Sequence, residues 1–296
     1  MHRYGPSVRD HWTAGPRVVG DGGIEVATWD LGGDGPPLLL AHGTGFHAKV
    51  WLPVAGPLRP RFHVWGVDQR GHGSSGHAPD GDYSDWDRFA LDLLAVADAV
   101  GAGEPLYGAG HSLGGAVLLR CEQLRPGTFR ALYCYEPAVV PKGHEPAADG
   151  SGLSELARKR RLRFASREDA LANYAGKSPF AAFDREVLEG YVAHGFVDEP
   201  DGSVRLACRP EEEASVFGGA AASPVWDELD RVAPPVTVGK GWELTGGGAV
   251  APPVAARLPD ARLEIHGDLD HFGPMVAPAR IGAAIGAALD AARVGG

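Results

Sequence analysis

The segment that decides the fold is a serine bounded by glycines: residues 108–115 read Gly-Ala-Gly-His-Ser-Leu-Gly-Gly. A short apolar run precedes it and an apolar run with helical spacing follows it. A strand, a Gly-x-Ser-x-Gly segment and a helix, in that order, form a tight turn in which the serine is strained. Side chains at Gly110 or Gly114 would collide with their neighbours. The segment therefore predicts a turn that exposes the hydroxyl of Ser112 beside a helix N-terminus, which favours developing negative charge.

The composition is that of an ordinary globular chain with a large core. It has 296 residues, of which 44% are hydrophobic and 22% charged. Its net charge of −10 argues against a nucleic-acid partner. The chain lacks an apolar leader and any run of 18 apolar residues, so we expect no membrane span. Widely spaced cysteines predict reduced thiols in a cytoplasmic protein: Cys121, Cys134 and Cys208.

Strands alternate with helices in the first part of the chain. Apolar runs predict strands at residues 38–41, 62–67, 105–107 and 132–136. Such alternation implies a mostly parallel sheet, whose chemistry collects at the carboxyl ends of the strands. Between residues 137 and 234 the alternation stops and helical spacing dominates. We therefore predict a core of residues 1–136 and 235–296, with a mainly helical cap of residues 137–234 inserted in it.

Four motifs follow the predicted strands. They are His42-Gly43, Asp-x-Arg-Gly-x-Gly-x-Ser at residues 68–75, Gly-x-Ser-x-Gly at residues 110–114, and Asp-His-Phe at residues 270–272. In this order they resemble the α/β-hydrolase superfamily over nearly the whole chain from about Ile24, least closely in the cap. The resemblance implies an α/β fold with a mostly parallel, twisted eight-stranded sheet, helices on both faces and a mainly helical cap inserted after the sixth strand.

The resemblance makes Ser112 the nucleophile and His271 its base. A serine hydroxyl is a weak nucleophile at neutral pH and needs a base to take its proton. His271 follows the last predicted strand, residues 262–265, where the superfamily carries a late Gly-His-Phe stretch. His266 is the nearest rival, but it lies inside or at the end of that strand. We expect His111 to pack and hydrogen-bond beside the serine, and His42 to be structural.

The third member of the expected catalytic triad is an acid that orients the histidine, and the sequence offers more than one candidate for it. In most relatives an aspartate follows the strand after the cap, in a Gly-x-x-Asp pattern. The corresponding residues 239–243 read Gly-Lys-Gly-Trp-Glu, so Trp242 stands at the place of the aspartate and Glu243 lies one residue later. This departure from the pattern leaves the usual strand without its usual acid.

The superfamily has a second arrangement, seen in some haloalkane dehalogenases. There a glutamate ends the strand that follows the Gly-x-Ser-x-Gly turn. Glu136 stands at that position, 24 residues past the nucleophile. A carboxylate buried at a strand end needs a partner, and the predicted base would supply one. We therefore expect Glu136 to be the acid, with Glu243 as the alternative; Asp268, Asp270 and a site with no acid also stay open.

The resemblance assigns the oxyanion hole to the backbone N–H groups of Leu113 and Thr44, with Gly45 as the alternative to Thr44. Asp68 and Arg70 resemble the structural turn of the superfamily. The chain shows no metal-ligand spacing, and residues 108–113 lack the third glycine of a dinucleotide fingerprint. We therefore expect neither a cofactor nor a metal.

The predicted cap supplies aromatic and basic side chains. Its helices are expected at residues 153–164, 166–174 and 184–194, followed by a hairpin about residues 200–202. A basic run, residues 158–163, reads as a solvated helix face or as an attractor of a carboxylate- or phosphate-bearing substrate. The aromatic residues are expected to pack the cap, while a few roof a pocket for an apolar group: Phe164, Tyr174, Phe180, Phe183, Tyr191, Phe196 and Phe217.

These features predict a serine-dependent carboxylic ester hydrolase that cleaves an ester, lactone or thioester of a small, largely apolar substrate. A second class of function reuses the same pocket without hydrolysis, as a lyase, a cyclase, a C–C bond-cleaving enzyme or a small-molecule receptor. The sequence leaves open the identity and stereochemistry of the substrate and the oligomeric state.

Overall fold

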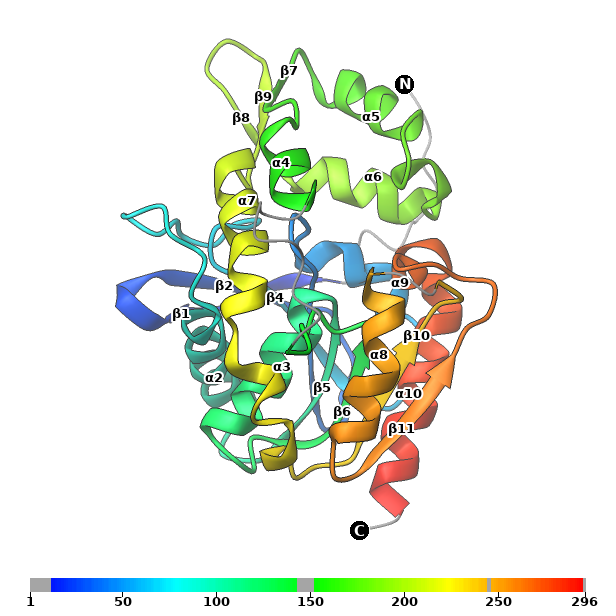
Figure 1. The fold of residues 1–296 in the computed structure, drawn as a ribbon. Helices are drawn as coiled ribbons and strands as arrows, with labels where there is room; N and C mark the ends of the chain where they lie inside the picture. Colours follow the sequence, from blue (N-terminus) through cyan, green and yellow to red (C-terminus); the bar gives the residue numbers. More distant parts are fainter. Residues whose placement is uncertain (1–11, 143–151, 244–245, 295–296) are drawn as a thin grey trace.

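The centre of the molecule is an eight-stranded, mostly parallel sheet (Figure 1). The computed structural model describes residues 12–142, 152–243 and 246–294. In spatial order the strands are β1 (Thr13–Val19), β2 (Glu25–Asp30), β4 (His63–Asp68), β3 (Pro37–Ala41), β5 (Leu106–His111), β6 (Phe129–Tyr135), β10 (Val236–Lys240) and β11 (Ala261–Ile265). β2 pairs antiparallel with β1 and β4, and the other neighbours are parallel. The predicted fold class and sheet are confirmed.

Helices cover both faces of this sheet. Residues 38–41 of β3 are fully buried, with Leu38 and Leu40 in one hydrophobic core and Leu39 and Ala41 in the other. Successive side chains of a strand point to opposite faces, so a wholly apolar strand needs cover on both. The first core is closed by α1 (Leu52–Ala55) and α10 (Pro278–Val294), and the second by α2 (Trp86–Gly101), α3 (Leu113–Leu124) and α8 (Gly246–Arg257). None of the described helices combines the length and apolar character that crossing a membrane requires.

Between β6 and β10 the chain forms a group of elements that we call the cap; its elements are α4 (Gly152–Arg158), β7 (Arg163–Phe164), α5 (Arg167–Ala175), α6 (Arg185–His194), β8 (Phe196–Asp198), β9 (Val204–Leu206) and α7 (Pro210–Gly219). The elements from α4 to β9 gather at one end of the sheet, and α7 leads from them back toward the core (Figure 1). β8 and β9 are the expected hairpin. The helix predicted over residues 153–164 is wrong in its second half, because residues 163–164 pair with β9 as a short strand. The domain boundaries at residues 136 and 235 stay a prediction.

Strand register decides which residues meet at the site. His111, the last residue of β5, pairs with Tyr135, the last residue of β6, and Tyr135 pairs with Gly239 of β10. The chain leaves these neighbouring strands at the same edge of the sheet. Ser112 and Glu136 are the next residues along, so the register brings them to adjacent strand ends, where parallel sheets carry their chemistry.

Candidate active site

Ser112 occupies a strained turn between β5 and α3. Its φ and ψ are 51° and −118°, a conformation that residues with side chains rarely adopt. A Cβ on Gly110 would lie 2.6 Å from backbone atoms of Gly114 and Gly115, and one on Gly114 would collide with the carbonyl oxygen of Ala41. Both glycines of the motif are therefore required, and the serine is held half-buried at the strand end.

Backbone hydrogen bonds fix this turn to β6 and to the loop after it. The N–H of Ser112 donates to the carbonyl of Tyr135 at 3.0 Å, and its own carbonyl accepts from the N–H groups of Ala116 (3.1 Å) and Ala138 (3.0 Å). Leu113 begins α3, where the first N–H groups of a helix have no partner within it. The turn therefore presents a rigid serine next to a helix N-terminus.

The imidazole of His271 meets the carboxylate of Glu136. His271 lies in the loop between β11 and α9 (Gly273–Val276), and its Nδ1–H donates to Oε2 of Glu136 at 2.8 Å. The side chain of Glu136 is fully buried, whereas that of His271 is 26% exposed. This hydrogen bond makes Nδ1 the nitrogen that faces the carboxylate, and Nε2 the nitrogen on the other side of the ring.

Glu136 is held by the two neighbouring strand ends. Its φ is 41°, its N–H donates to the carbonyl of Gly239, and its Oε1 accepts the N–H of Gly241 at 2.8 Å. Each oxygen of this buried carboxylate therefore has a hydrogen-bond partner, as a buried polar group requires. The backbone strain and the two bonds together aim the carboxylate at His271.

Two glycines at the start of α8 leave room for this pair, and the sequence interpretation missed them. A Cβ on Gly247 would lie 2.6 Å from Oε2 of Glu136 and 2.8 Å from Nδ1 of His271. A Cβ on Gly248 would approach Oε1 of Glu136 to 3.3 Å. The signal that could have revealed them is the run of three glycines, residues 246–248, that follows the strand lacking the usual aspartate.

Two of the other candidate acids have different partners. Glu243 is held through its backbone carbonyl, which accepts from Nζ of Lys240 at 3.1 Å. Asp268 forms a surface ion pair with Arg280, and Oδ1 of Asp270 accepts the N–H of Phe272. The rival histidine also points elsewhere: the ring of His266 contacts the hydroxyl of Tyr133 and the carboxylate of Glu264. Among these candidates, Glu136 is the carboxylate that the structure brings to His271.

His111 supports the loop that carries His271. Its Nε2–H donates to the backbone carbonyl of His271 at 2.9 Å, and the two rings lie 4.7 Å apart. Burial, together with His271, lowers the pKa of His111 well below its ordinary value. A neutral ring keeps this tautomer, so His111 has the hydrogen-bonding role expected of it.

A turn after β3, residues 42–45, faces Ser112, and two buried histidines hold it. A Cβ on Gly43 would lie 3.4 Å from Cβ of Ser112. The Nδ1–H of His42 donates to the carbonyl of Gly43 at 2.8 Å, while the N–H of Gly45 donates to Nε2 of His72 at 3.0 Å. The N–H of Gly45 is therefore already engaged, which favours Thr44 over Gly45 as the donor of this turn. Burial lowers the pKa of His42 to about 4 and that of His72 to about 3, so both rings stay neutral.

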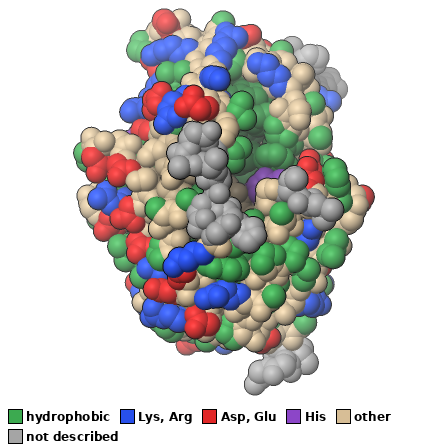
Figure 2. Space-filling model, in the orientation of Figure 1, with side chains coloured by type: hydrophobic (Ala, Val, Ile, Leu, Met, Phe, Trp, Pro, Cys, Tyr) green, Lys and Arg blue, Asp and Glu red, His purple; other side chains and the backbone are tan. Residues whose placement is uncertain are grey.

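Aromatic side chains from the core and the cap gather around this edge of the sheet. Phe46, which follows the turn, contacts Phe183 of the cap and Phe272 beside His271, with ring centroids 6.0 and 6.3 Å apart. Phe46 also lies 5.6 Å from Tyr191 on α6. Figure 2 shows a hollow between the cap and the core whose walls are largely hydrophobic, with a histidine side chain visible inside it. The surroundings of the site therefore suit an apolar group.

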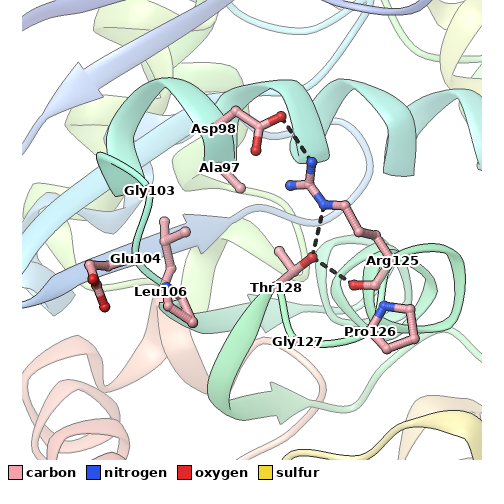
Figure 3. Close-up of a pocket in the computed structure, with 10 residues that line it drawn as sticks. Ala97, Asp98, Gly103, Glu104, Leu106, Arg125, Pro126, Gly127 and Thr128 are labelled. Atoms are coloured by element: carbon pink, nitrogen blue, oxygen red, sulfur yellow. Dashed lines mark hydrogen bonds and ion pairs between the residues drawn. The ribbon is translucent and has the colours of Figure 1, made fainter.

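A second hollow lies at the other end of the strands, beside the starts of β5 and β6 (Figure 3). Arg125 reaches Oδ2 of Asp98 at 2.9 Å and Oγ1 of Thr128 at 3.2 Å across this hollow. Glu104 on its rim pairs with Arg130. Its charged groups are thus engaged in ion pairs and hydrogen bonds, and we assign it no chemistry.

The strained serine, the histidine–carboxylate pair and the sheet order define an α/β hydrolase. The chain belongs to the alpha/beta hydrolase family, whose model matches residues 38–284. The fold is also that of the solved (E)-2-(acetamidomethylene)succinate hydrolase, with a TM-score of 0.77, 22% identity, and coverage of 95% of this chain and 100% of that one. The protein is therefore a member of a family of hydrolases.

Curated relatives match the chain over shorter segments. A pimeloyl-(acyl-carrier protein) methyl ester esterase from Methylococcus capsulatus is 31% identical over 130 residues, which are 43% of this chain and 48% of that protein. Lipase LipV from Mycobacterium tuberculosis is 33% identical over 136 residues, which are 45% of this chain and 47% of that protein. The chain thus spans a little under half the length of these relatives.

Proposed function

We propose that the protein is a serine hydrolase that cleaves an ester, lactone or thioester of a small, largely apolar substrate through an acyl-enzyme on Ser112. The observation that carries this proposal is the 2.8 Å hydrogen bond between His271 and the buried Glu136, on the strand next to the strained serine. Relatives named as an esterase and a lipase support the choice of ester chemistry.

The first step is attack on the substrate carbonyl. Nε2 of His271 takes the proton of the Ser112 hydroxyl as the serine oxygen forms a bond to the carbonyl carbon. Glu136 holds the tautomer with Nδ1–H and stabilises the imidazolium that results. His271 then gives the proton to the departing alcohol or thiol, which leaves the acyl group on Ser112. Water then attacks the acyl-enzyme while His271 takes its proton. The bond to the serine oxygen breaks, the carboxylic acid leaves, and His271 returns the proton to Ser112.

The negative charge on the tetrahedral intermediate needs donors in place before it forms. The N–H groups of Leu113 and Thr44 are suited to this task, since α3 adds its positive N-terminal end and the engaged N–H of Gly45 fixes the turn. One such donor is commonly worth about 10²–10³ in kcat. The site therefore uses backbone donors that no side-chain substitution removes directly.

The aromatic surroundings set the size and character of the substrate. Phe46, Phe183 and Phe272 lie together beside the site, so an acyl or ring group of apolar character gains free energy by leaving water. Because these side chains come from both core and cap, the distance between them limits the chain length that fits. We expect short or medium acyl groups to be favoured.

The experiment that tests the proposal is turnover of a panel of 4-nitrophenyl esters, lactones and thioesters of increasing chain length. Wild-type protein is expected to hydrolyse part of the panel, and Ser112→Ala to lose about 10⁵–10⁶-fold in kcat. Ser203→Ala, in the cap hairpin, is the matched control and should keep wild-type turnover. Retention of activity by Ser112→Ala contradicts the acyl-enzyme mechanism.

A further inference from the structure

One arginine of the basic run points into the molecule. Arg160 has 17% of its side chain exposed. The remaining arginines of the run are about half exposed and pair with acidic residues of the cap surface: Arg158, Arg161 and Arg163. The expectation of a solvated face therefore holds for these three, and Arg160 needs a separate explanation.

Arg160 is bound by one carboxylate and two phenols. Its Nη1 pairs with Oε2 of Glu213 on α7, and its Nη2 donates to the hydroxyl oxygens of Tyr191 (2.5 Å) and Tyr174 (3.0 Å). The side chain of Glu213 is only 7% exposed. Burial works to lower the pKa of Arg160, but Tyr191 and Glu213 outweigh it and hold the pKa well above its ordinary value. The cap thus holds a buried, charge-compensated ion pair.

This pair lies directly over the turn that faces the nucleophile. A Cβ on Gly45 would lie 2.6 Å from Oε1 of Glu213 and 3.1 Å from Nη1 of Arg160. Gly45 directly follows Thr44, the residue to which we assign an oxyanion donor. Both charges of the pair therefore stand within a few Å of the backbone that receives the substrate carbonyl.

The two charges act in opposite directions on whatever binds there. An unpaired Glu213 would repel the developing oxyanion and any anionic substrate, because a unit charge at such distances has a strong effect in a partly buried site. An unpaired Arg160 would attract an anion and offer a fork of donors to a carboxylate. When both charges are present, their electrostatic fields largely cancel. The site then offers a charged substrate group no counter-ion to offset the loss of its hydration, whereas an uncharged group has no such cost.

We propose that the Arg160–Glu213 pair determines the charge specificity of the site. The pair keeps the side of the cap that faces the turn at residues 42–45 electrically neutral. It thereby selects substrates whose group next to this turn is uncharged. This inference rests on the proposed hydrolase function. Removing the glutamate charge shifts the preference of the site toward a carboxylate-bearing ester, and removing the arginine charge disfavours such an ester further.

The test compares two esters that differ in one group. In mono-4-nitrophenyl adipate a carboxylate replaces the terminal methyl of 4-nitrophenyl hexanoate. Wild-type protein is expected to prefer the hexanoate by kcat/KM. Glu213→Gln should shift the ratio toward the adipate by about tenfold or more, as one unit charge at several Å produces at an effective dielectric constant of about 20. Arg160→Gln should shift it by a similar factor the other way.

Two further variants make the outcome decisive. Arg160→Gln leaves a buried carboxylate unpaired and can fail to fold, so the double variant with Glu213→Gln takes its place and should return the ratio to within about threefold of wild type. Glu211→Gln makes the same change in net charge as Glu213→Gln but acts on an exposed glutamate of α7; it should leave the ratio unchanged.

Labelling of Ser112 by a fluorophosphonate separates this inference from the proposed function. If Ser112 is labelled and both esters are hydrolysed, but Glu213→Gln keeps the wild-type ratio, the specificity role of the pair is wrong. An equal shift in Glu211→Gln would also overturn it, because a general change in net charge would then explain the result. If Ser112 is neither labelled nor acylated by either ester, the proposed function itself fails.

Discussion

The carboxylate of Glu136 and the imidazole of His271 meet at 2.8 Å, although 135 residues separate them in the sequence. The contact requires the end of β6, the loop after β11 and the glycines that open α8 to converge at one point. Glu136 is fully buried and hydrogen-bonded through both oxygens, so its position leaves little freedom to the ring of His271.

Replacing this carboxylate should disable the base and leave the fold in place. Glu136→Gln is expected to lower kcat about 10³–10⁴-fold, because an amide neither stabilises the imidazolium nor selects the correct tautomer. Steady-state kinetics on the best ester of the panel measure the effect. Glu243→Gln is the control and should stay near wild type. Near wild-type turnover in both variants would exclude both assignments of the acid.

Filling the space over the pair should also reduce activity. Gly247→Ala introduces a methyl group 2.6 Å from Glu136 Oε2 and 2.8 Å from His271 Nδ1, which forces the two groups apart. Since small misplacements of catalytic groups are costly, we expect kcat to fall about 10²-fold.

A second helical glycine provides the control for Gly247→Ala. A Cβ on Gly218 of α7 meets no atom within 4 Å, so Gly218→Ala should keep its activity. It should also gain about 0.5–1 kcal/mol of stability, because alanine favours the helix. Equal turnover in the two variants contradicts a catalytic role for the contact between Glu136 and His271.

The turn at residues 42–45, which we propose to supply an oxyanion donor, should depend on the acceptor that His72 provides. His72→Leu removes the partner of the Gly45 N–H, so we expect the free energy of unfolding to fall by about 1–3 kcal/mol. We also expect kcat to fall more than KM changes, because the turn acts mainly on the transition state. His72→Gln keeps an acceptor near the place of Nε2 and should recover most of the loss in kcat. A leucine variant with wild-type kcat would show that the turn does not need this bond.

Buried histidines should make the protein sensitive to moderate acid. Burial lowers the pKa from 6.5 to about 4 in His42 and His47 and to about 3 in His72. The unfolded chain therefore binds protons below about pH 6.5 that the folded protein does not. Stability from these groups is complete above that pH and is lost as the pH falls toward 4, by about 1.4 kcal/mol per group and pH unit. Urea unfolding at pH 7.5, 6.0 and 5.0 measures this loss; a midpoint independent of pH in this range would contradict it.

Much of the fold and the contact of Glu136 with His271 could be predicted because the relevant signals are local. Alternating strands and helices imply a parallel sheet, and the position of Glu136 at the end of one predicted strand indicates a place beside the nucleophile. The missing aspartate near Trp242 pointed to the same residue. Strand ends can be read from short stretches of sequence, so residues next to them can be placed.

The remaining features depend on contacts between distant segments. The basic run does not reveal that Arg160 turns inward. The sequence predicts a helix over residues 153–164, whereas α4 ends at Arg158 and an irregular segment follows it. The bond between Gly45 and His72 joins two loops, and the need for Gly247 arises only when α8 approaches Glu136. Such features follow from packing, which local sequence patterns do not encode.

The central claim is that Ser112 forms a covalent acyl-enzyme with the help of His271. Its most direct test is the mass of the intact protein after reaction with a fluorophosphonate, followed by peptide mapping. We expect one adduct, located on Ser112, that forms rapidly in wild type, slowly in His271→Ala and not at all in Ser112→Ala. No adduct in wild type, or an adduct on another residue with Ser112 unmodified, would contradict it.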